Sequence, residues 1–169
     1  MKRYQDKICL ITASSTGIGL AIAHRFASEG ATVIISSRSA PNVNSAVEQI
    51  KNLGFSAVGF PCHVGNKKDR ENLINFISKN YGKLDVLVAN AAVSTFFGDL
   101  FEIKEEQMDK MYEVNLKSTF FLVKESLGLL RKGTNPNVCI VSSYAAFEPD
   151  LTIAFYSVTK TALIGLMKV

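Results

Sequence analysis

Cysteine, histidine and long apolar segments are all scarce in this sequence. Its 169 residues include three cysteines and two histidines, and no CxxC pair is present. Cys9, Cys62 and Cys139 are therefore expected as reduced core residues rather than as disulfide partners or zinc ligands, and no metal site is expected. No apolar run approaches the roughly 18 residues of a membrane-spanning helix, and the N-terminus lacks a signal-peptide core. Secretion and membrane insertion are disfavoured, and a cytoplasmic location is expected.

Charge of one sign is not concentrated anywhere along the chain. The 19 basic and 15 acidic residues are interspersed and leave a net charge of +4. A nucleic-acid-binding surface would need a basic stripe with interleaved aromatic residues, so nucleic acid is not expected as a partner. Hydrophobic residues make up 47% of the chain and charged residues 20%, as in an ordinary folded domain. The length predicts a single domain over residues 1–169.

Short β-branched runs alternate with longer segments of helical period. Strands are expected at residues 7–12, 32–36, 56–61, 85–89 and 137–142, and helices at 17–29, 42–53, 69–81, 105–132 and from about 155 onward. Because strands joined through right-handed helical crossovers lie parallel, this alternation predicts an α/β fold with a doubly wound, Rossmann-like parallel sheet of five strands. The last helix still shows an apolar face at Val169. We expect either further chain or another subunit to cover that face.

A glycine-containing turn links the first expected strand to the first helix. In such turns glycines let the backbone approach a pyrophosphate, and the helix N-terminus offers unpaired N–H groups to the anion. Ala13 stands where the first glycine of a GxxxGxG pattern would fall; since alanine is disfavoured only at positive φ, binding need not be lost. A tight turn without a ligand is the alternative. The candidate cofactor-binding residues here are Ala13, Ser14, Ser15, Thr16, Gly17, Ile18 and Gly19.

The residue that reads the adenosine ribose lies about 20 residues further on in dinucleotide-binding folds. An acid there binds the free 2′-hydroxyl, whereas an arginine nearby accommodates a 2′-phosphate. This sequence has Ser37 and Arg38 after the second strand and no Asp or Glu. Because a guanidinium suits a phosphate dianion, the sequence predicts NADP(H) in preference to NAD(H). The alternative is that Arg38 is a solvated charge at the end of a strand.

Tyr156 is the one tyrosine with a lysine four residues later, Lys160. On a helix these two side chains share a face, and a neighbouring ammonium favours the phenolate form, which makes Tyr156 a candidate general acid/base. Ser143 lies at the carboxyl end of the fifth strand, where open α/β sheets bind ligands; it can bond a substrate oxygen or simply cap the strand end. Asn115 interrupts an apolar helical stretch and must find polar partners, face the cleft or lie on the helix surface.

The order of these motifs resembles the short-chain dehydrogenases/reductases. The resemblance rests on the glycine turn ending at Gly19, on Asn90-Ala91-Ala92, on Asn115, on Ser143 and on the segment from Tyr156 to Lys160. Finer detail at residues 36–38, 62–65, 90–93 and 96–98 resembles the NADPH-dependent carbonyl and retinal reductase branch, known as dehydrogenase/reductase family member four. The chain is thus expected to be a C-terminally truncated member of this family.

The resemblance implies a role for each matching position. Tyr156 would protonate a carbonyl oxygen as hydride arrives from the nicotinamide, and Lys160 would assist Tyr156 and hold the nicotinamide ribose. Ser143 would position the substrate oxygen, and Asn115 would anchor a water that links Lys160 to solvent. The resemblance adds further cofactor-binding positions: His63, Val64, Asn90, Ala91 and Ala92. Many relatives have an aspartate in place of His63, and a partly buried strand-end histidine is the favoured interpretation.

The resemblance also implies the overall function. We expect an NADP(H)-dependent oxidoreductase that interconverts small aldehydes or ketones, retinoids included, and alcohols, with Phe96, Phe97, Phe147 and Phe155 near the cleft. A homo-oligomer, dimer or tetramer, is expected through the long helix and the helix of Tyr156. Family members normally continue through two more strands and a substrate loop, so the alternative is a truncated, catalytically silent nucleotide-binding or interaction module. An extended-branch epimerase fits less well, and a peroxisomal location is open to a longer form.

Overall fold

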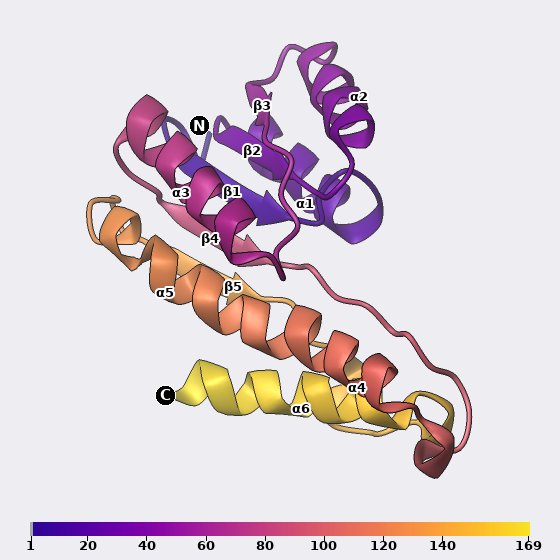
Figure 1. Cartoon of the computed structure of the whole chain (residues 1–169). Helices are drawn as coiled ribbons and strands as arrows, with labels where there is room; N and C mark the ends of the chain where they lie inside the picture. The colour runs from indigo at the N-terminus through magenta and orange to yellow at the C-terminus, as the bar shows by residue number, and fades with distance from the viewer. Residues whose placement is uncertain (1) are drawn as a thin grey trace.

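The computed structural model describes residues 2–169 and contains one parallel five-stranded sheet. The strands are β1 (Ile8–Thr12), β2 (Thr32–Ser36), β3 (Ala57–Gly59), β4 (Val86–Ala89) and β5 (Asn137–Ile140), and the main helices are α1 (Gly17–Ser28), α2 (Ala40–Lys51), α3 (Lys67–Tyr81), α4 (Glu105–Met111), α5 (Ser118–Leu130) and α6 (Ala154–Lys168). The strand order is β3-β2-β1-β4-β5 (Figure 1). From β1 the chain first adds β2 and β3 on one side and then β4 and β5 on the other. Ligands of such sheets bind beyond the carboxyl ends of the strands at this switch between β1 and β4. The predicted doubly wound α/β fold is confirmed.

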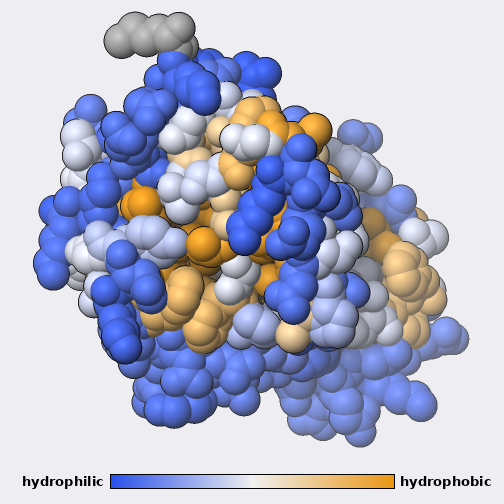
Figure 2. All heavy atoms as spheres, turned by 90° about the horizontal axis from the view of Figure 1, so that it is seen from above, coloured by the Kyte–Doolittle hydropathy of each residue, from blue (hydrophilic) through white to orange (hydrophobic). Residues whose placement is uncertain are grey.

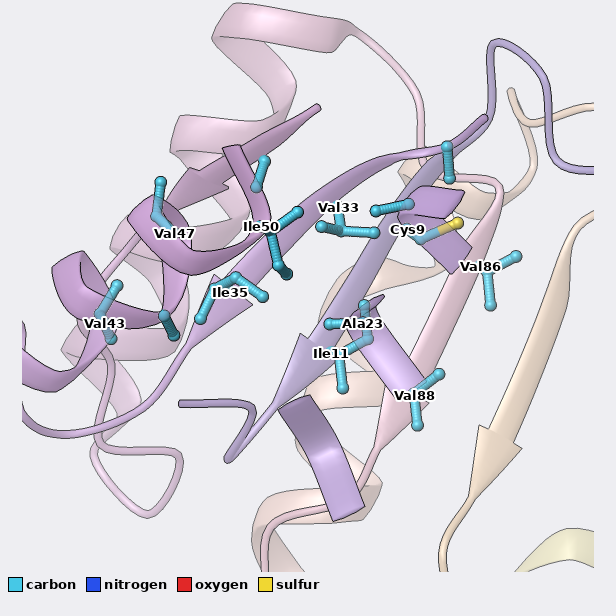
Figure 3. Close-up of a cluster of buried hydrophobic side chains, with 14 residues drawn as sticks. Cys9, Ile11, Ala23, Val33, Ile35, Val43, Val47, Ile50, Val86 and Val88 are labelled. Carbon is cyan, nitrogen blue, oxygen red and sulfur yellow. The ribbon is translucent and has the colours of Figure 1, made fainter. Parts of the chain in front are cut away.

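Strands β1, β2 and β4 are largely apolar and buried because helices cover both faces of the sheet there. Successive residues of a strand point to opposite faces: Cys9 and Ile11 pack toward α1 and α2, as Figure 3 shows, whereas Leu10 packs in a second cluster with residues of α3 and α5. Figure 2 shows that hydrophilic residues cover most of the face seen there, with hydrophobic residues visible in a band between them. This two-sided core holds the carboxyl ends of β1 and β4 at fixed positions, where the candidate site lies.

The long helix predicted at residues 105–132 is not continuous. It consists of α4, a π-helical turn η2 (Tyr112–Lys117) and α5. A π-helical turn widens the helix by one residue, and this one carries Asn115, which is fully buried. The surface position considered for Asn115 is therefore wrong. No proline or glycine interrupts residues 112–117, so the sequence offered no local signal for a break in the helix.

Smaller differences concern strand ends and cysteines. The third and fifth strands are shorter than expected, and short 3₁₀ turns occupy the connections: η1 (Leu100–Glu102), η3 (Tyr144–Ala146) and η4 (Leu151–Ile153). Cys9 and Cys62 are buried, and this burial raises the pKa of both thiols to about 12. Cys139 is exposed, contrary to the expectation of a core position. It lies in β5, the edge strand of the sheet, whose residues are mostly exposed. Within residues 2–169, no helix is both long and apolar enough to span a bilayer.

Candidate functional site

The turn after β1 has an unusual backbone at its first position. Ala13 has φ +49° and Gly17 has φ +56°, the left-handed region in which alanine is disfavoured by about 1 kcal/mol or more. The next residue fixes the turn: Ser14 Oγ donates a hydrogen bond to Ile11 O (2.6 Å) and accepts one from Ser36 N (3.0 Å). Ala13 thus occupies the one backbone region that its side chain tolerates poorly.

Gly19 is required for a different reason, namely close packing. A Cβ at this position would collide with Ala13 O and would lie 2.7 Å from Asn90 Nδ2. The first turn of α1 therefore packs directly against the backbone of the turn and the end of β4. Only glycine leaves room for this approach.

Asn90 joins the ends of β1 and β4. Its Nδ2 donates hydrogen bonds to Thr12 O (3.0 Å) and Ala13 O (3.1 Å), and its backbone N–H donates to Thr12 Oγ1 (3.0 Å). These bonds give the carbonyl groups of the turn partners that no helix or strand supplies. Asn90 therefore stabilises the turn through these bonds, and it does not line the adjacent cleft.

A cleft of about 280 Å³ opens beside the turn. Nine of its lining residues belong to the predicted cofactor set: Ala13, Ser15, Thr16, Ser37, Arg38, His63, Val64, Ala91 and Ala92. The other predicted positions, Ser14, Gly17, Ile18, Gly19, Asn90, Tyr156 and Lys160, do not line it. The sequence reasoning missed five lining residues: Ser39, Asn42, Cys62, Val93 and Val114. Ser39 and Asn42 could have been found, because the capping serine and first turn of α2 directly follow Arg38.

Arg38 and Ser37 present polar groups to the cleft that a ligand could bind. Arg38 is exposed and is part of no ion pair among the described residues. The Ser37 Oγ is buried and has no hydrogen-bond partner, which is costly for a polar atom unless a ligand satisfies it. His63 is half-buried; its backbone N–H donates to Asp69 Oδ2 (2.9 Å), and its Nδ1 accepts a bond from Gly65 N (3.1 Å).

Tyr156 and Lys160 lie one turn apart on α6. Lys160 is only 2% exposed; its Nζ donates to Val141 O (2.8 Å) and lies 5.5 Å from the centroid of the Tyr156 ring. Burial lowers the pKa of the Lys160 ammonium to about 8, because removal from water disfavours the charged form. The lysine is thus anchored below the tyrosine by the backbone that follows β5.

Tyr156 lines a second cavity of about 340 Å³ together with Ala92, Val93, Ser94, Phe97 and Ile153. Ala92 and Val93 also line the first cleft, so the two hollows adjoin. A ligand extending from Arg38 past Ala92 would therefore approach the tyrosine hydroxyl. Ser143 lines neither cavity; its Oγ accepts a hydrogen bond from Ala145 N (3.2 Å) and caps η3.

Asn115 connects the wall between the two cavities to α6. Its Oδ1 accepts a bond from Val93 N (2.8 Å), and its Nδ2 donates to Val93 O (2.9 Å) and to Thr159 Oγ1 (3.0 Å). Thr159 Oγ1 in turn donates to Tyr156 O (2.7 Å). Both amide hydrogens of Asn115 are used in these bonds, so its side chain holds the site together and has no hydrogen left for a water.

Comparison with known proteins identifies the family. A family model described as short chain dehydrogenase matches residues 7–169. Dehydrogenase/reductase SDR family member 4 from Bos taurus is 46% identical over 163 residues, which are 96% of this chain and 58% of that protein. Tropinone reductase-like 3 from Erythroxylum coca is 45% identical over 167 residues, which are 99% of this chain and 64% of that protein.

A third relative, short-chain dehydrogenase/reductase SDRA from Arabidopsis thaliana, is 41% identical over 99% of this chain and 65% of that protein. The chain spans between 58% and 65% of the length of these relatives. The resemblance seen in the motifs is confirmed along nearly the whole length of the chain: the chain belongs to the short-chain dehydrogenase/reductase family.

Proposed function

We propose that the chain binds NADP(H) and interconverts aldehydes or ketones and the corresponding alcohols by hydride transfer. Members of this family use a nicotinamide cofactor. The observation that carries the proposal is the position of Tyr156, one helical turn from the buried Lys160 and at the wall of a cavity that adjoins the cleft of the glycine turn. When bound there, the nicotinamide supplies or accepts the hydride.

The residues in and beside the cleft fit such a cofactor. Gly19 keeps the turn free of a side chain where the backbone is closest packed, and the N-terminus of α1 offers N–H groups to a phosphate. The unpaired Ser37 hydroxyl and the exposed Arg38 guanidinium lie in one wall. A phosphate on the adenosine 2′-oxygen would accept hydrogen bonds from both, whereas a free 2′-hydroxyl would leave the guanidinium without an anion.

The proton chemistry belongs to Tyr156. Its hydroxyl would donate a proton to the carbonyl oxygen of a substrate in the cavity of Phe97 and Ile153 and would take one back in the reverse direction. Lys160, whose pKa is lowered to about 8 by burial, remains largely an ammonium at neutral pH and would favour the phenolate left behind. Ser143 would add a hydrogen bond to the same oxygen when a substrate draws its hydroxyl toward the cavity.

The test is turnover of an aromatic diketone or retinal with NADPH, followed at the absorbance band of the reduced nicotinamide. The unmodified chain is expected to oxidise NADPH, and Tyr156→Phe is expected to lose at least about a hundredfold in rate. Tyr112→Phe, at an exposed tyrosine of η2, is the matched control and is expected to retain the rate. Cofactor binding without oxidation would instead support a catalytically silent nucleotide-binding module.

The cofactor preference has its own test. Arg38→Asp is expected to raise the dissociation constant of NADPH about 10- to 100-fold, since it removes hydrogen bonds to a charged group, and to bring NADH binding level with NADPH binding. Arg131→Asp changes the net charge equally at an exposed position outside the cleft and serves as the control. An unchanged NADPH preference in Arg38→Asp would refute the assignment.

We also propose a homo-oligomer formed through α5 and α6. Phe120 and Leu127 on α5 and Met167 on α6 are exposed apolar side chains, and exposed apolar faces of this kind mark interaction surfaces. Light scattering tests the proposal: a species of at least twice the 18.5 kDa chain mass is expected, and a monodisperse monomer at micromolar concentration would contradict it.

A further inference from the structure

Arg70 is a buried arginine that joins three elements near the cleft. It lies in the first turns of α3 and is only 5% exposed. Its Nε and Nη2 donate to the two carboxylate oxygens of Glu125 on α5 (3.0 and 3.1 Å), and its Nη1 donates to Val64 O (2.7 Å). The ring of Phe121 lies 5.5 Å from the guanidinium carbon. Each of the three guanidinium nitrogens therefore makes a hydrogen bond, and the one from Nη1 reaches the loop after β3.

That loop forms part of the cleft. His63 and Val64 line the cleft of about 280 Å³ together with Ser37 and Arg38. Backbone bonds from Cys62 N to Ser37 O (2.9 Å) and from Asn66 N to His63 O (2.8 Å) shape this loop. Two neighbouring residues of α3 add side-chain bonds: Asp69 accepts a bond from His63 N (2.9 Å), and Arg70 donates to Val64 O. The bond to Val64 O comes from the Arg70 guanidinium, so the position of Val64 in this wall depends on where α3 places that group.

We propose that Arg70 is a positioning residue for the adenosine end of the cofactor site, with Glu125 fixing the orientation of its guanidinium. This inference rests on the proposed function, because it takes the cleft lined by Arg38 as the place of the adenosine. A lysine cannot replace Arg70, because a single ammonium cannot present a planar fork to Glu125 and also reach Val64 O in the same geometry. The nicotinamide end, beside Tyr156, has no contact with Arg70 or Glu125.

The test separates the two halves of the cofactor. Calorimetry measures the dissociation constants of NADPH, of adenosine 2′,5′-bisphosphate and of reduced nicotinamide mononucleotide for the unmodified chain and for Arg70→Lys. We expect Arg70→Lys to weaken NADPH and the adenosine half about tenfold, the loss typical of one hydrogen bond to a charged group, and to leave the nicotinamide half unchanged. Glu125→Gln, which keeps the Arg70–Val64 bond, is expected to show the same pattern with a smaller loss.

A matched variant separates positioning from general destabilisation. Ile77→Val removes one methyl group from a fully buried residue of the same helix and is expected to lower the urea midpoint of unfolding without weakening the binding of either half. The proposal is overturned if Ile77→Val weakens the adenosine half as much as Arg70→Lys, or if Arg70→Lys weakens both halves equally or neither.

Hydrogen exchange separates failure of this inference from failure of the proposed function. If the unmodified chain binds neither NADPH nor its halves, the proposed function fails. The inference is then decided by amide exchange at residues 63–66. Selectively faster exchange there in Arg70→Lys, and not in Ile77→Val, supports Arg70 as the residue that positions this loop, and equal exchange in the two variants refutes it.

Discussion

The strained backbone of Ala13 destabilises the turn of the candidate site. Ala13 has φ +49°, a conformation that costs an alanine about 1 to 2 kcal/mol. A glycine would adopt it freely but would lose more conformational entropy on folding. Because the relief of strain is larger than the loss of entropy, a glycine at this position would stabilise the folded chain. The present alanine makes the turn stiffer than a glycine would.

Ala13→Gly is expected to raise the unfolding free energy by about 0.5 to 1 kcal/mol. Urea denaturation measures the change. Ala23→Gly, in the buried face of α1, is the control and should destabilise by at least a comparable amount, because a helical alanine has no strain to relieve. A loss of stability in Ala13→Gly would contradict the strained backbone.

The buried Lys160 makes the free energy of unfolding depend on pH. Its pKa is lowered to about 8 in the folded chain by burial, whereas an unfolded lysine titrates near 10.5. Between these values the unfolded chain binds more protons, so the lysine's contribution to stability rises with pH from about 8 to 10.5. The thiols of Cys9 and Cys62, with pKa raised to about 12 by burial, act in the opposite sense.

A comparison of the unmodified chain with Lys160→Met isolates the contribution of Lys160 to the free energy of unfolding. We expect the difference in unfolding free energy between the two to shift by up to about 3 kcal/mol in favour of the unmodified chain between pH 7.5 and 10.5, from the size of a pKa unit. Denaturant titration at stepped pH measures it. A difference that stays constant with pH would show that Lys160 is not desolvated.

At the scale of elements, glycines in helices have opposite roles. Gly19 in α1 has no room for a side chain, because a Cβ would meet Ala13 O and Asn90, whereas Gly165 in α6 has nothing within 4 Å of that position. The helical φ of both residues is acceptable to alanine. The same substitution therefore tests packing alone.

Gly19→Ala is expected to destabilise the chain by about 2 kcal/mol through overpacking and to abolish measurable cofactor binding. Gly165→Ala is expected to stabilise it by about 0.5 to 1 kcal/mol, the ordinary gain of alanine over glycine in a helix. Thermal unfolding ranks the two variants. Equal effects would mean that the turn yields and the close contact is not needed.

The π-helical turn between α4 and α5 is the element that joins the site. Asn115 bonds Val93 in the cavity wall and Thr159 on α6. Asn115→Ala should leave the N–H and C=O of Val93 unpaired and lower the unfolding free energy by about 3 kcal/mol. Asn80→Ala, which removes one exposed bond to Phe76 O, should cost no more than about 0.5 kcal/mol in the same urea titration. Similar costs would contradict a joining role.

The sequence predicted the elements well because their signals are local. Strand and helix periodicity, the glycine turn and the spacing of Tyr156 and Lys160 can each be read within a short window. The π-helical turn was missed because no proline or glycine marks residues 112–117. The bonds of Arg70 to Glu125 and of Asn115 to Thr159 join residues 55 and 44 positions apart. Such pairs depend on how the helices and strands pack, and no local sequence pattern encodes this packing.

At the scale of the whole molecule, the two ends of the sheet have separate tasks. The carboxyl ends of β1, β2 and β4 lead into the candidate site, whereas the opposite end is closed by Asp85. Its carboxylate accepts bonds from Ile8 N (2.9 Å) and Thr134 N (2.7 Å) and pairs with Lys83 (3.0 Å). It thereby ties the start of β1 to the segment that leads into β5.

Asp85 should therefore serve stability and leave binding untouched. Burial opposes its charge, but the bonds from Ile8 and Thr134 and the Lys83 ammonium outweigh burial and hold the pKa of Asp85 below its ordinary value. Its contribution is thus present above the unfolded pKa near 4 and is lost as pH falls through the lower folded value. Asp85→Asn is expected to lower the unfolding free energy by about 3 kcal/mol at pH 7 and to flatten the acid limb of the stability profile.

The same variant, studied well below its unfolding temperature, should bind NADPH with an unchanged dissociation constant, in contrast to Arg70→Lys and Gly19→Ala. Calorimetry of the three variants at one temperature measures this contrast. Because β1, β2 and β4 are buried and closely packed, a loss of bonds at their amino end should raise the unfolded fraction without altering the geometry at their carboxyl end. A weakened dissociation constant in folded Asp85→Asn would instead mean that the sheet transmits distortion along its strands.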